Sequence, residues 1–240
     1  MPNIKKILQE HSLRNIKPFI TRAREPFFQM AKDYVEPGSV ILDIGSGEGG
    51  FAKYLERDDV YMIDGNQATV ELLKKSLKTF SFENIQYGKL PELPFEGNKF
   101  DIIHTSHLVE HLAPHELYDL LKEIDRCLKP SGVLIVSAPL LWTGFYDDMS
   151  HLKPYYPSVF TNYLCSSGRN RTRMAISSSY KVLKTQYRYW YAHSHLKSHV
   201  FIRNKFLNML CYIIRLGVYL IGFRKLEVTG YTTVLRKEAE

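Results

Sequence analysis

The chain has 240 residues, 45% of them hydrophobic, so it can bury the core of one full domain. Its three cysteines lie far apart, with no C-x-x-C pair and no histidine at metal-ligand spacing. This pattern excludes a disulfide framework and favours reduced thiols in a cytoplasmic protein. Residues 1–19 mix charged and apolar side chains without an uninterrupted apolar core, so we expect no signal peptide there.

The net charge of +7 is distributed unevenly along the chain. Residues 1–150 hold 17 Lys and Arg against 22 Asp and Glu, whereas residues 151–240 hold 15 against 3. No acidic residue occurs between His151 and Leu226. We therefore expect an acidic half that binds a cofactor and a basic half that meets an anionic partner, the alternative being a solvated basic surface without a partner.

Residues 1–37 are predicted to form an N-terminal helical cap. Apolar residues recur near helical spacing in two segments, 4–8 and 18–34, and Pro37-Gly38 then makes a turn into the first strand. We expect this segment to pack over the open end of a sheet formed by the domain at residues 38–240.

The stretch Val40–Gly50 combines a buried strand with a glycine turn. Four apolar strand formers are followed at once by glycines spaced G-x-G-x-G, which let backbone amides approach a ligand at the strand's carboxyl end. Asp43 lies inside the strand end, and its carboxylate suits a ligand with an ammonium group. The run Leu42–Gly49 resembles the first motif of class I S-adenosylmethionine-dependent methyltransferases. The resemblance implies that the methionine end of the cofactor is held by Asp43, Gly45, Ser46, Gly47 and Gly49.

A second acidic residue, Asp64, ends the next predicted strand 21 residues after Asp43. A carboxylate at this tip can accept hydrogen bonds from both ribose hydroxyls of a nucleoside. The sequence Asp64-Gly65-Asn66 is also good turn chemistry, which is the structural alternative. We expect Asp64, Gly65 and Asn66 to contact the cofactor.

Two further segments complete the predicted cofactor site. The loop Gly88–Phe95 resembles the family's loop at the adenine, although Lys89 stands where an acidic residue is usual, so the backbone of Leu90 is expected to contribute instead. Phe100–Thr105 is the fourth strand, and the run from Ser106 to Leu112 resembles the family's strand ending in x-L-E-H. Ser106 is included among the cofactor-binding residues.

These motifs, in this order, predict an α/β fold: a Rossmann-like, seven-stranded, doubly wound sheet. Its last strand is expected to run antiparallel, after a helical insertion at residues 193–225. The competing dehydrogenase interpretation lacks the third-glycine spacing and any signal for a nicotinamide. The family is identified as that of type 11 and type 23 methyltransferases, with resemblance to quinone-biosynthesis and polysaccharide-modifying O-methyltransferases.

The acceptor side is predicted at residues 140–175, a loop and helix beyond the fifth strand. Methyl transfer needs mainly alignment, but an oxygen acceptor must also lose its proton, most simply to a histidine. The candidates are His151 and His107, with Asp148 orienting His151. Glu110 and His111 are the less favoured bases. Comparable segments in quinone O-methyltransferases can supply metal ligands, but His107 replaces one acid, and we predict no metal.

The insertion carries a mostly apolar helix, Phe206–Phe223, with one narrow polar stripe and basic flanks. Arg215 at its centre and its short length argue against a spanning helix. A helix lying in a membrane interface or gripping a lipid-linked substrate is one interpretation of residues 203–225. The other is a helix buried against the domain or a dimer partner.

The sequence thus predicts a methyltransferase, which is a transferase that uses S-adenosyl-L-methionine. Its expected acceptor is an oxygen of a small molecule, a glycan or a lipid-linked compound, and this acceptor can be anionic. We expect it in the cytoplasm, with peripheral contact to the inner membrane face. One alternative is an RNA methyltransferase that uses the basic, tyrosine-rich C-terminal half. Another is a non-catalytic, membrane-peripheral module that binds S-adenosylmethionine.

Overall fold

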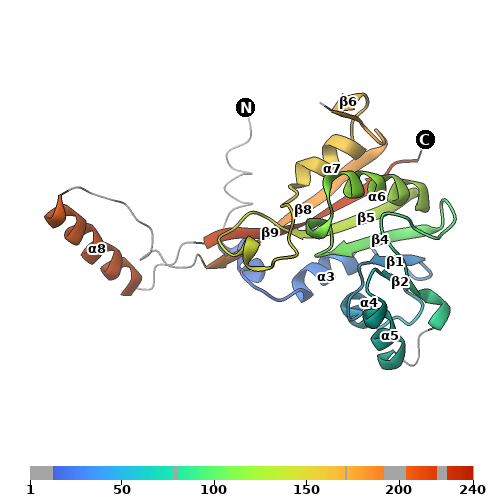
Figure 1. Ribbon diagram of the computed structural model, residues 1–240, viewed down its shortest axis with the longest axis horizontal. Coiled ribbons are helices and arrows are strands. Elements are labelled where there is room, and N and C mark those ends of the chain that lie inside the picture. Colours follow the sequence, from blue (N-terminus) through green and yellow to red (C-terminus); the bar gives the residue numbers. More distant parts are fainter. Residues whose placement is uncertain (1–12, 78–80, 171, 192–203, 221–225, 240) are drawn as a thin grey trace.

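A seven-stranded sheet with helices on both faces forms the body of the computed structural model (Figure 1). The structure describes residues 13–77, 81–170, 172–191, 204–220 and 226–239. The strand order is β3-β2-β1-β4-β5-β9-β8, with β1 to β5 parallel and β9 antiparallel between β5 and β8. The bounds are β1 Ile41–Ile44, β2 Tyr61–Asp64, β3 Ile85–Tyr87, β4 Phe100–Ser106, β5 Leu128–Pro139, β8 Tyr180–Tyr191 and β9 Leu226–Lys237. The predicted α/β class, the seven strands and the antiparallel final strand are confirmed.

Two apolar layers enclose the sheet because successive strand residues face opposite sides. On one face the core includes side chains of α6 (Pro114–Cys127) and α7 (Pro157–Leu164). On the other it includes α3 (Glu25–Lys32), α4 (Gly50–Leu55) and α5 (Gln67–Ser76). The remaining helical elements are α2 Leu13–Ile16, α8 Lys205–Leu220 and four 3-10 turns, η1 Lys17–Phe19, η2 Phe82–Asn84, η3 Val109–His111 and η4 Phe145–Asp147.

Two segments differ from the sequence expectation. The sequence Lys129-Pro130-Ser131-Gly132 predicts a turn before the fifth strand. In the structure it lies within β5 as an irregularity, because the register with β4 shifts after Phe100–Leu128 and Ser131 takes a φ of +67°. The alternate arginines of residues 168–173 lie in a sequence context that predicts a flexible segment, but this stretch contains β6 (Arg169–Asn170), which pairs antiparallel with β7 (Arg173–Met174). In the second segment, pairing between β6 and β7 satisfies backbone groups that the local sequence signal leaves open.

The N-terminal segment joins the sheet at its far edge. Ile20 forms a parallel bridge with Tyr189 of β8, and the Thr21 N–H donates to the Tyr189 carbonyl at 3.2 Å. Further on, Phe28 of α3 packs against Phe51 of α4, with ring centroids 5.6 Å apart. This segment therefore ties the last strand pair to the helix that follows β1. Residues 1–12 of the predicted cap lie outside the described residues.

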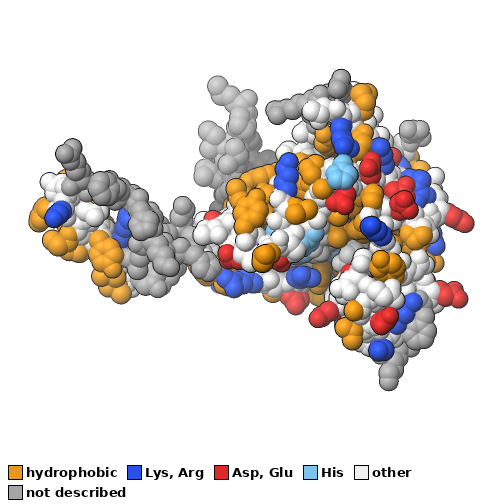
Figure 2. All heavy atoms as spheres, viewed as in Figure 1, with side chains coloured by type: hydrophobic (Ala, Val, Ile, Leu, Met, Phe, Trp, Pro, Cys, Tyr) orange, Lys and Arg blue, Asp and Glu red, His pale blue; other side chains and the backbone are white. Residues whose placement is uncertain are grey.

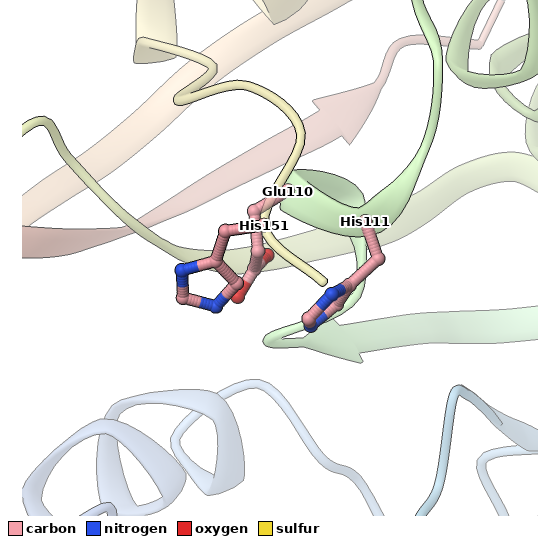
Figure 3. Close-up of side chains that lie close together, drawn as sticks. All are labelled: Glu110, His111 and His151. Atoms are coloured by element: carbon pink, nitrogen blue, oxygen red, sulfur yellow. The ribbon is translucent and has the colours of Figure 1, made fainter. Parts of the chain in front are cut away.

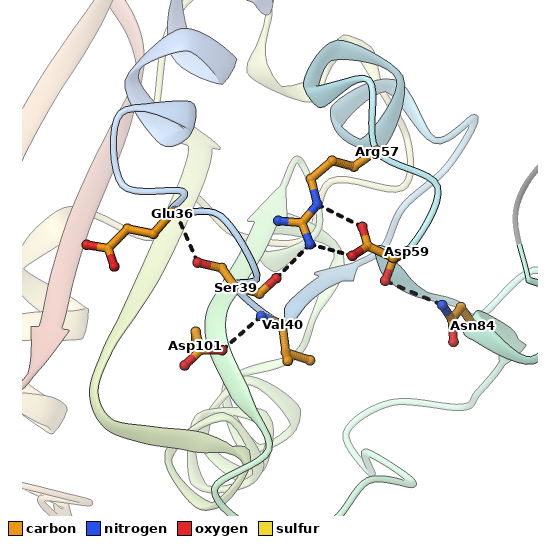
Figure 4. Close-up of polar contacts among 7 residues, drawn as sticks. All are labelled: Glu36, Ser39, Val40, Arg57, Asp59, Asn84 and Asp101. Carbon is orange, nitrogen blue, oxygen red and sulfur yellow. Dashed lines mark hydrogen bonds and ion pairs between the residues drawn. The ribbon is translucent and has the colours of Figure 1, made fainter.

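Polar contacts fix the chain where it enters β1 (Figure 4). The Val40 N–H donates to Asp101 Oδ2 at 2.8 Å, and Arg57 donates to the Ser39 carbonyl at 2.8 Å. Burial disfavours the charged form of Asp101, but the bonds from Val40 and Lys129 outweigh it and hold the pKa of this carboxyl below its usual value. Hydrogen bonds with the side chains of Asp101 and Arg57 thus fix residues 39 and 40, which lead into β1.

Helix α8 stands well apart from the sheet in Figure 1. It belongs to the predicted insertion, whose residues 193–203 and 221–225 lie outside the described ranges. Among the described residues, no helix has the length and apolar character needed to cross a membrane.

Candidate active site

The glycine loop between β1 and α4 has the backbone that its sequence requires. Gly45, Gly47 and Gly49 have φ values of +69°, +53° and +70°, in the left-handed region that favours glycine. A Cβ on Gly49 would lie 2.9 Å from Leu73, and one on Gly45 would lie 3.1 Å from Leu108. A Cβ on Gly47 would meet nothing within 4 Å. Gly45 and Gly49 are thus needed for packing, whereas Gly47 borders open space that a ligand can fill.

Asp43 forms a buried pair that the sequence analysis did not predict. Its Oδ1 lies 2.7 Å from Nδ1 of His104, the residue opposite it on β4, and both side chains are almost fully buried. The His104 ring stacks on Phe51 at a centroid distance of 3.9 Å. Sequence signals could not have found this pair, because it depends on the β1–β4 register. The predicted contact between Asp43 and the cofactor's ammonium group stays a prediction.

Asp64 connects the glycine loop to the tip of β2. Its Oδ2 accepts from the Gly47 N–H and its Oδ1 from the Asn66 N–H, both at 2.9 Å. The Asn66 side chain in turn caps α5 by accepting from the N–H of Ala68 at 3.0 Å. Asp64 therefore makes both the turn contact and a hydrogen bond to the glycine loop. Its carboxylate oxygens each have a further lone pair, which can accept a hydrogen bond from a ribose hydroxyl.

The loop after β3 lies beside this tip. The Gly88 N–H donates to the Asp64 carbonyl at 3.1 Å, and a Cβ on Gly88 would overlap Ile63 at 2.3 Å. The following Lys89 is exposed and Leu90 is half-buried. The predicted cofactor residues thus gather at the carboxyl edge of four neighbouring strands: Asp43, Gly45, Ser46, Gly47 and Gly49 at β1, Asp64, Gly65 and Asn66 at β2, Lys89 and Leu90 after β3, and Ser106 at β4.

A pocket of about 430 Å³ opens at the same edge of the sheet. It combines segments far apart in sequence: Thr21 and Arg22, His107 after β4, Pro139 of β5, Trp142, Asp147 and His151 of the following loop, Arg188 and Trp190 of β8, and Thr229 of β9. Both predicted catalytic histidines line it. Asp148 does not, and its neighbour Asp147 takes that place. The β8 side chains were missed because they lie more than thirty positions from any other lining residue, between His151 and Thr229.

At the pocket wall, His107 lies between two charged side chains, Glu110 and Arg188. Its Nδ1 is 3.2 Å from Oε1 of Glu110, which is fully buried, and its Nε2 accepts from Nη1 of Arg188 at 3.0 Å. Burial lowers the pKa of His107, and the Arg188 charge adds to this effect, although Glu110 opposes it. Burial also lowers the pKa of Arg188 to about 10. The backbone of His107 is strained, because its φ of +56° lies in the left-handed region that favours glycine.

The pocket wall is joined to the glycine loop. Leu108, the residue after His107, is the side chain that a Cβ on Gly45 would touch. The His107 N–H donates to the Ser137 carbonyl of β5 at 2.9 Å, which holds the segment against the sheet. The pocket and the loop are therefore neighbouring parts of one site.

Glu110, His111 and His151 form a cluster beside the pocket (Figure 3). One potential ligand atom from each lies within 4.8 Å of the others. Nδ1 of His111 lies 3.1 Å from the Ser150 carbonyl, and Nδ1 of His151 lies 2.6 Å from the Phe145 carbonyl. These carbonyls accept hydrogen bonds, so each ring carries its proton on Nδ1 and keeps the Nε2 lone pair. Neither Glu110 carboxylate oxygen accepts a hydrogen bond of good geometry from the described residues.

These three residues could therefore hold a divalent metal ion, with two imidazole nitrogens and one carboxylate as ligands. The expectation of no metal stays untested. The predicted role of Asp148 is weakened by the geometry: its Oδ2 is 3.9 Å from His151 Nε2, and its Oδ1 accepts from the Ser150 N–H at 2.9 Å. The Phe145 carbonyl, and not Asp148, makes the short contact that orients His151.

Comparisons with known proteins agree with this geometry. Residues 42–136 match a family model described as a methyltransferase domain. The chain is 32% identical over 111 residues to an uncharacterized methyltransferase of Schizosaccharomyces pombe, covering 41% of this chain and 39% of that protein. It is also 32% identical over 108 residues to a demethylmenaquinone methyltransferase of Staphylococcus aureus, covering 42% and 43%. The chain spans less than half the length of the first curated relatives it matches.

Solved structures extend the likeness to almost the whole chain. A methyltransferase from Archaeoglobus fulgidus, described as dependent on S-adenosylmethionine, has a TM-score of 0.54 at 17% identity, with 97% of this chain and 99% of that chain covered. A Haloferax volcanii complex of the Trm112 activator with a putative methyltransferase has a TM-score of 0.58 at 13% identity, with 99% of each chain covered. At these identities the likeness concerns the fold.

The fold is that of the class I S-adenosylmethionine-dependent methyltransferases, as predicted. Residues 42–136 are similar to the methyltransferase domain of the family model, and the described fold has an S-adenosylmethionine-dependent enzyme among its structural neighbours.

Proposed function

We propose that this protein transfers the methyl group of S-adenosylmethionine to an oxygen of a small, anionic acceptor bound in the pocket between β4, β5 and β8. One observation carries the proposal: the pocket wall at His107 is continuous with the glycine loop through Leu108 and Gly45. An acceptor in the pocket can therefore approach a cofactor held at the loop. Placing the two reactants side by side supplies most of what methyl transfer requires.

The charges at the pocket favour an anionic acceptor. Arg188 and Arg22 line it, with Asp147 as the acidic residue on the wall. Arg188 is largely desolvated, and its Nε has no hydrogen-bond partner among the described residues, so an incoming carboxylate or phosphate can supply one. Trp142 and Trp190 offer apolar surface for the body of the acceptor. These features support an anionic group joined to an apolar or planar body.

The two histidines are proposed to have different roles: His107 positions Arg188, and His151 is the general base. His107 Nε2 accepts from Arg188, so His107 helps to position the anion-binding guanidinium. His151 has its Nδ1–H directed at the Phe145 carbonyl, which leaves Nε2 to accept the acceptor's hydroxyl proton. As the acceptor oxygen attacks the methyl carbon, the carbon–sulfur bond breaks and S-adenosylhomocysteine leaves. His151 retains the proton.

A divalent ion is an alternative way to activate the acceptor oxygen. Glu110, His111 and His151 would hold it, and the unsatisfied Glu110 carboxylate fits this role. When bound, such an ion favours the deprotonated form of a nearby hydroxyl. In that case His151 is a ligand and not the base. Turnover measured with Mg²⁺, Mn²⁺ or Zn²⁺ and after chelation distinguishes the two forms.

The proposal is tested in two stages. Calorimetry with S-adenosylmethionine measures cofactor binding, and a panel of phenolic acids, sugar phosphates and RNA is then screened for formation of S-adenosylhomocysteine. We expect a small anionic hydroxyl compound to be methylated, and Arg188→Gln to raise its KM at least tenfold while cofactor affinity is unchanged. Methylation of RNA alone, or no cofactor binding at all, would overturn the proposal.

A further inference from the structure

Helix α8 exposes apolar side chains along most of its length. Phe206, Leu210, Ile213 and Leu220 are 67%, 42%, 53% and 72% exposed, and Met209 and Ile214 are exposed to a similar degree. Figure 2 shows hydrophobic side chains gathered on α8, which stands away from the body of the domain. Such a concentration of exposed apolar area marks an interaction surface.

The polar residues of α8 lie on one stripe. Asn208, Tyr212 and Arg215 follow each other at steps of four and three, which keeps them on the same side of a helix. Lys205 lies next to that side. Phe206, Leu210 and Ile213 lie on the opposite side, about half a turn away. The helix is therefore amphipathic, with Arg215 in the stripe, Lys205 next to it, and an apolar face that is exposed among the described residues.

Charge decides between the kinds of surface that could cover this face. No acidic residue occurs between His151 and Leu226, and Arg203, Arg224 and Lys225 flank the helix in sequence. A second copy of the chain would bring equally basic insertions together, which is unfavourable. A membrane that contains anionic phospholipid offers both an apolar interior and complementary charge. At 16 residues, α8 is about 24 Å long, too short to span the bilayer, so it would lie along the interface.

We propose that α8 docks the protein on an anionic membrane surface, with its apolar face in the lipid and its polar stripe towards water. The helix lies between β8 and β9 in the chain, and these strands still pair at Tyr191 and Leu226, next to the pocket residue Trp190. The docked helix thus connects to the strand ends that line the acceptor pocket. The docking itself does not depend on the proposed methyl transfer.

The test measures binding of the full chain to vesicles by cosedimentation. Vesicles of phosphatidylcholine alone are compared with vesicles that also contain phosphatidylglycerol. We expect binding to the anionic vesicles that weakens as salt increases, and a loss of about tenfold or more in the double variant Leu210→Gln/Ile213→Gln. Leu72→Gln in α5, which is 66% exposed, is the matched control and should bind like the parent chain.

Calorimetry with S-adenosylmethionine accompanies each variant, so that failure of docking is separated from failure of the proposed activity. Retained cofactor binding with lost vesicle binding supports the docking role. Equal vesicle binding by the double variant and the Leu72→Gln control overturns it. So does a lipid-free dimer that the double variant dissociates, because α8 would then be covered by a second copy.

Discussion

The glycine loop allows packing and ligand binding to be separated by single substitutions. Gly47 and Gly38 both have positive φ values, +53° and +81°, and a Cβ on either meets nothing within 4 Å. Gly49 has a φ of +70°, and its Cβ would lie 2.9 Å from Leu73. Alanine at Gly38 or Gly47 therefore costs backbone strain alone, about 1–2 kcal/mol, partly offset by the lower entropy of the unfolded chain.

Alanine at Gly49 adds overpacking to the same strain. Displacing the Leu73 side chain costs about 1–3 kcal/mol more, giving roughly 2–5 kcal/mol in total. For a chain of this size, that corresponds to a fall in Tm of about 4–20 °C, against about 2–8 °C for Gly38→Ala or Gly47→Ala. Gly38 lies in the turn before β1, away from the loop, so Gly38→Ala controls for strain without touching the proposed cofactor site.

Calorimetric titration and thermal melting of the three variants give the comparison. We expect Gly38→Ala to bind S-adenosylmethionine like the parent chain and Gly47→Ala to lose at least tenfold in affinity, because its methyl group enters the space proposed for the cofactor. Two results would refute the reasoning: equal affinity in Gly38→Ala and Gly47→Ala, or a Gly49→Ala melting temperature no lower than that of Gly38→Ala.

Asp64→Asn should weaken S-adenosylmethionine binding about tenfold or more in calorimetry, because a neutral amide accepts weaker hydrogen bonds from ribose hydroxyls; unchanged affinity would contradict the ribose role. Glu110→Gln should abolish Mn²⁺ binding measured by calorimetry, if the cluster holds a metal, while His115→Gln on α6 leaves it unchanged; equal Mn²⁺ binding by both variants would rule the cluster out. Burial raises the pKa of Tyr155 to about 12, above its unfolded value near 10. Because the folded state holds this proton more tightly, the free energy of unfolding decreases as the pH rises from 10 to 12. Tyr155→Phe should reduce that alkaline loss by on the order of 2 kcal/mol in denaturant titrations, and an identical pH profile would contradict the assignment.

Local patterns in the sequence were sufficient to predict the sheet and to place the proposed cofactor site at the carboxyl ends of its strands. The strand of Val40–Ile44, the glycine spacing and Asp64 at the next strand end depend on neighbours a few residues away, and so do the turns that follow them. The parallel order then follows, because helices α4, α5 and α6 form the connections from β1 to β2, from β2 to β3 and from β4 to β5. At Lys129–Gly132 the sequence indicates a turn, and the structure incorporates these residues in β5 as an irregularity between the pairs made by Leu128 and Val133.

Only the tertiary structure decided the acceptor side. Arg188 meets His107 across 81 positions, and His104 meets Asp43 across 61, through strand register that no local signal encodes. Whether a histidine serves as base, ligand or positioning group depends on which ring nitrogen a neighbour occupies, as the Phe145 carbonyl does for His151. The sequence by itself determined a methyltransferase fold and the strand ends proposed to hold its cofactor, because strands and glycine turns are specified locally. The pocket's charges depend on side chains that meet only after the sheet has formed, so the acceptor's chemistry is specified by packing.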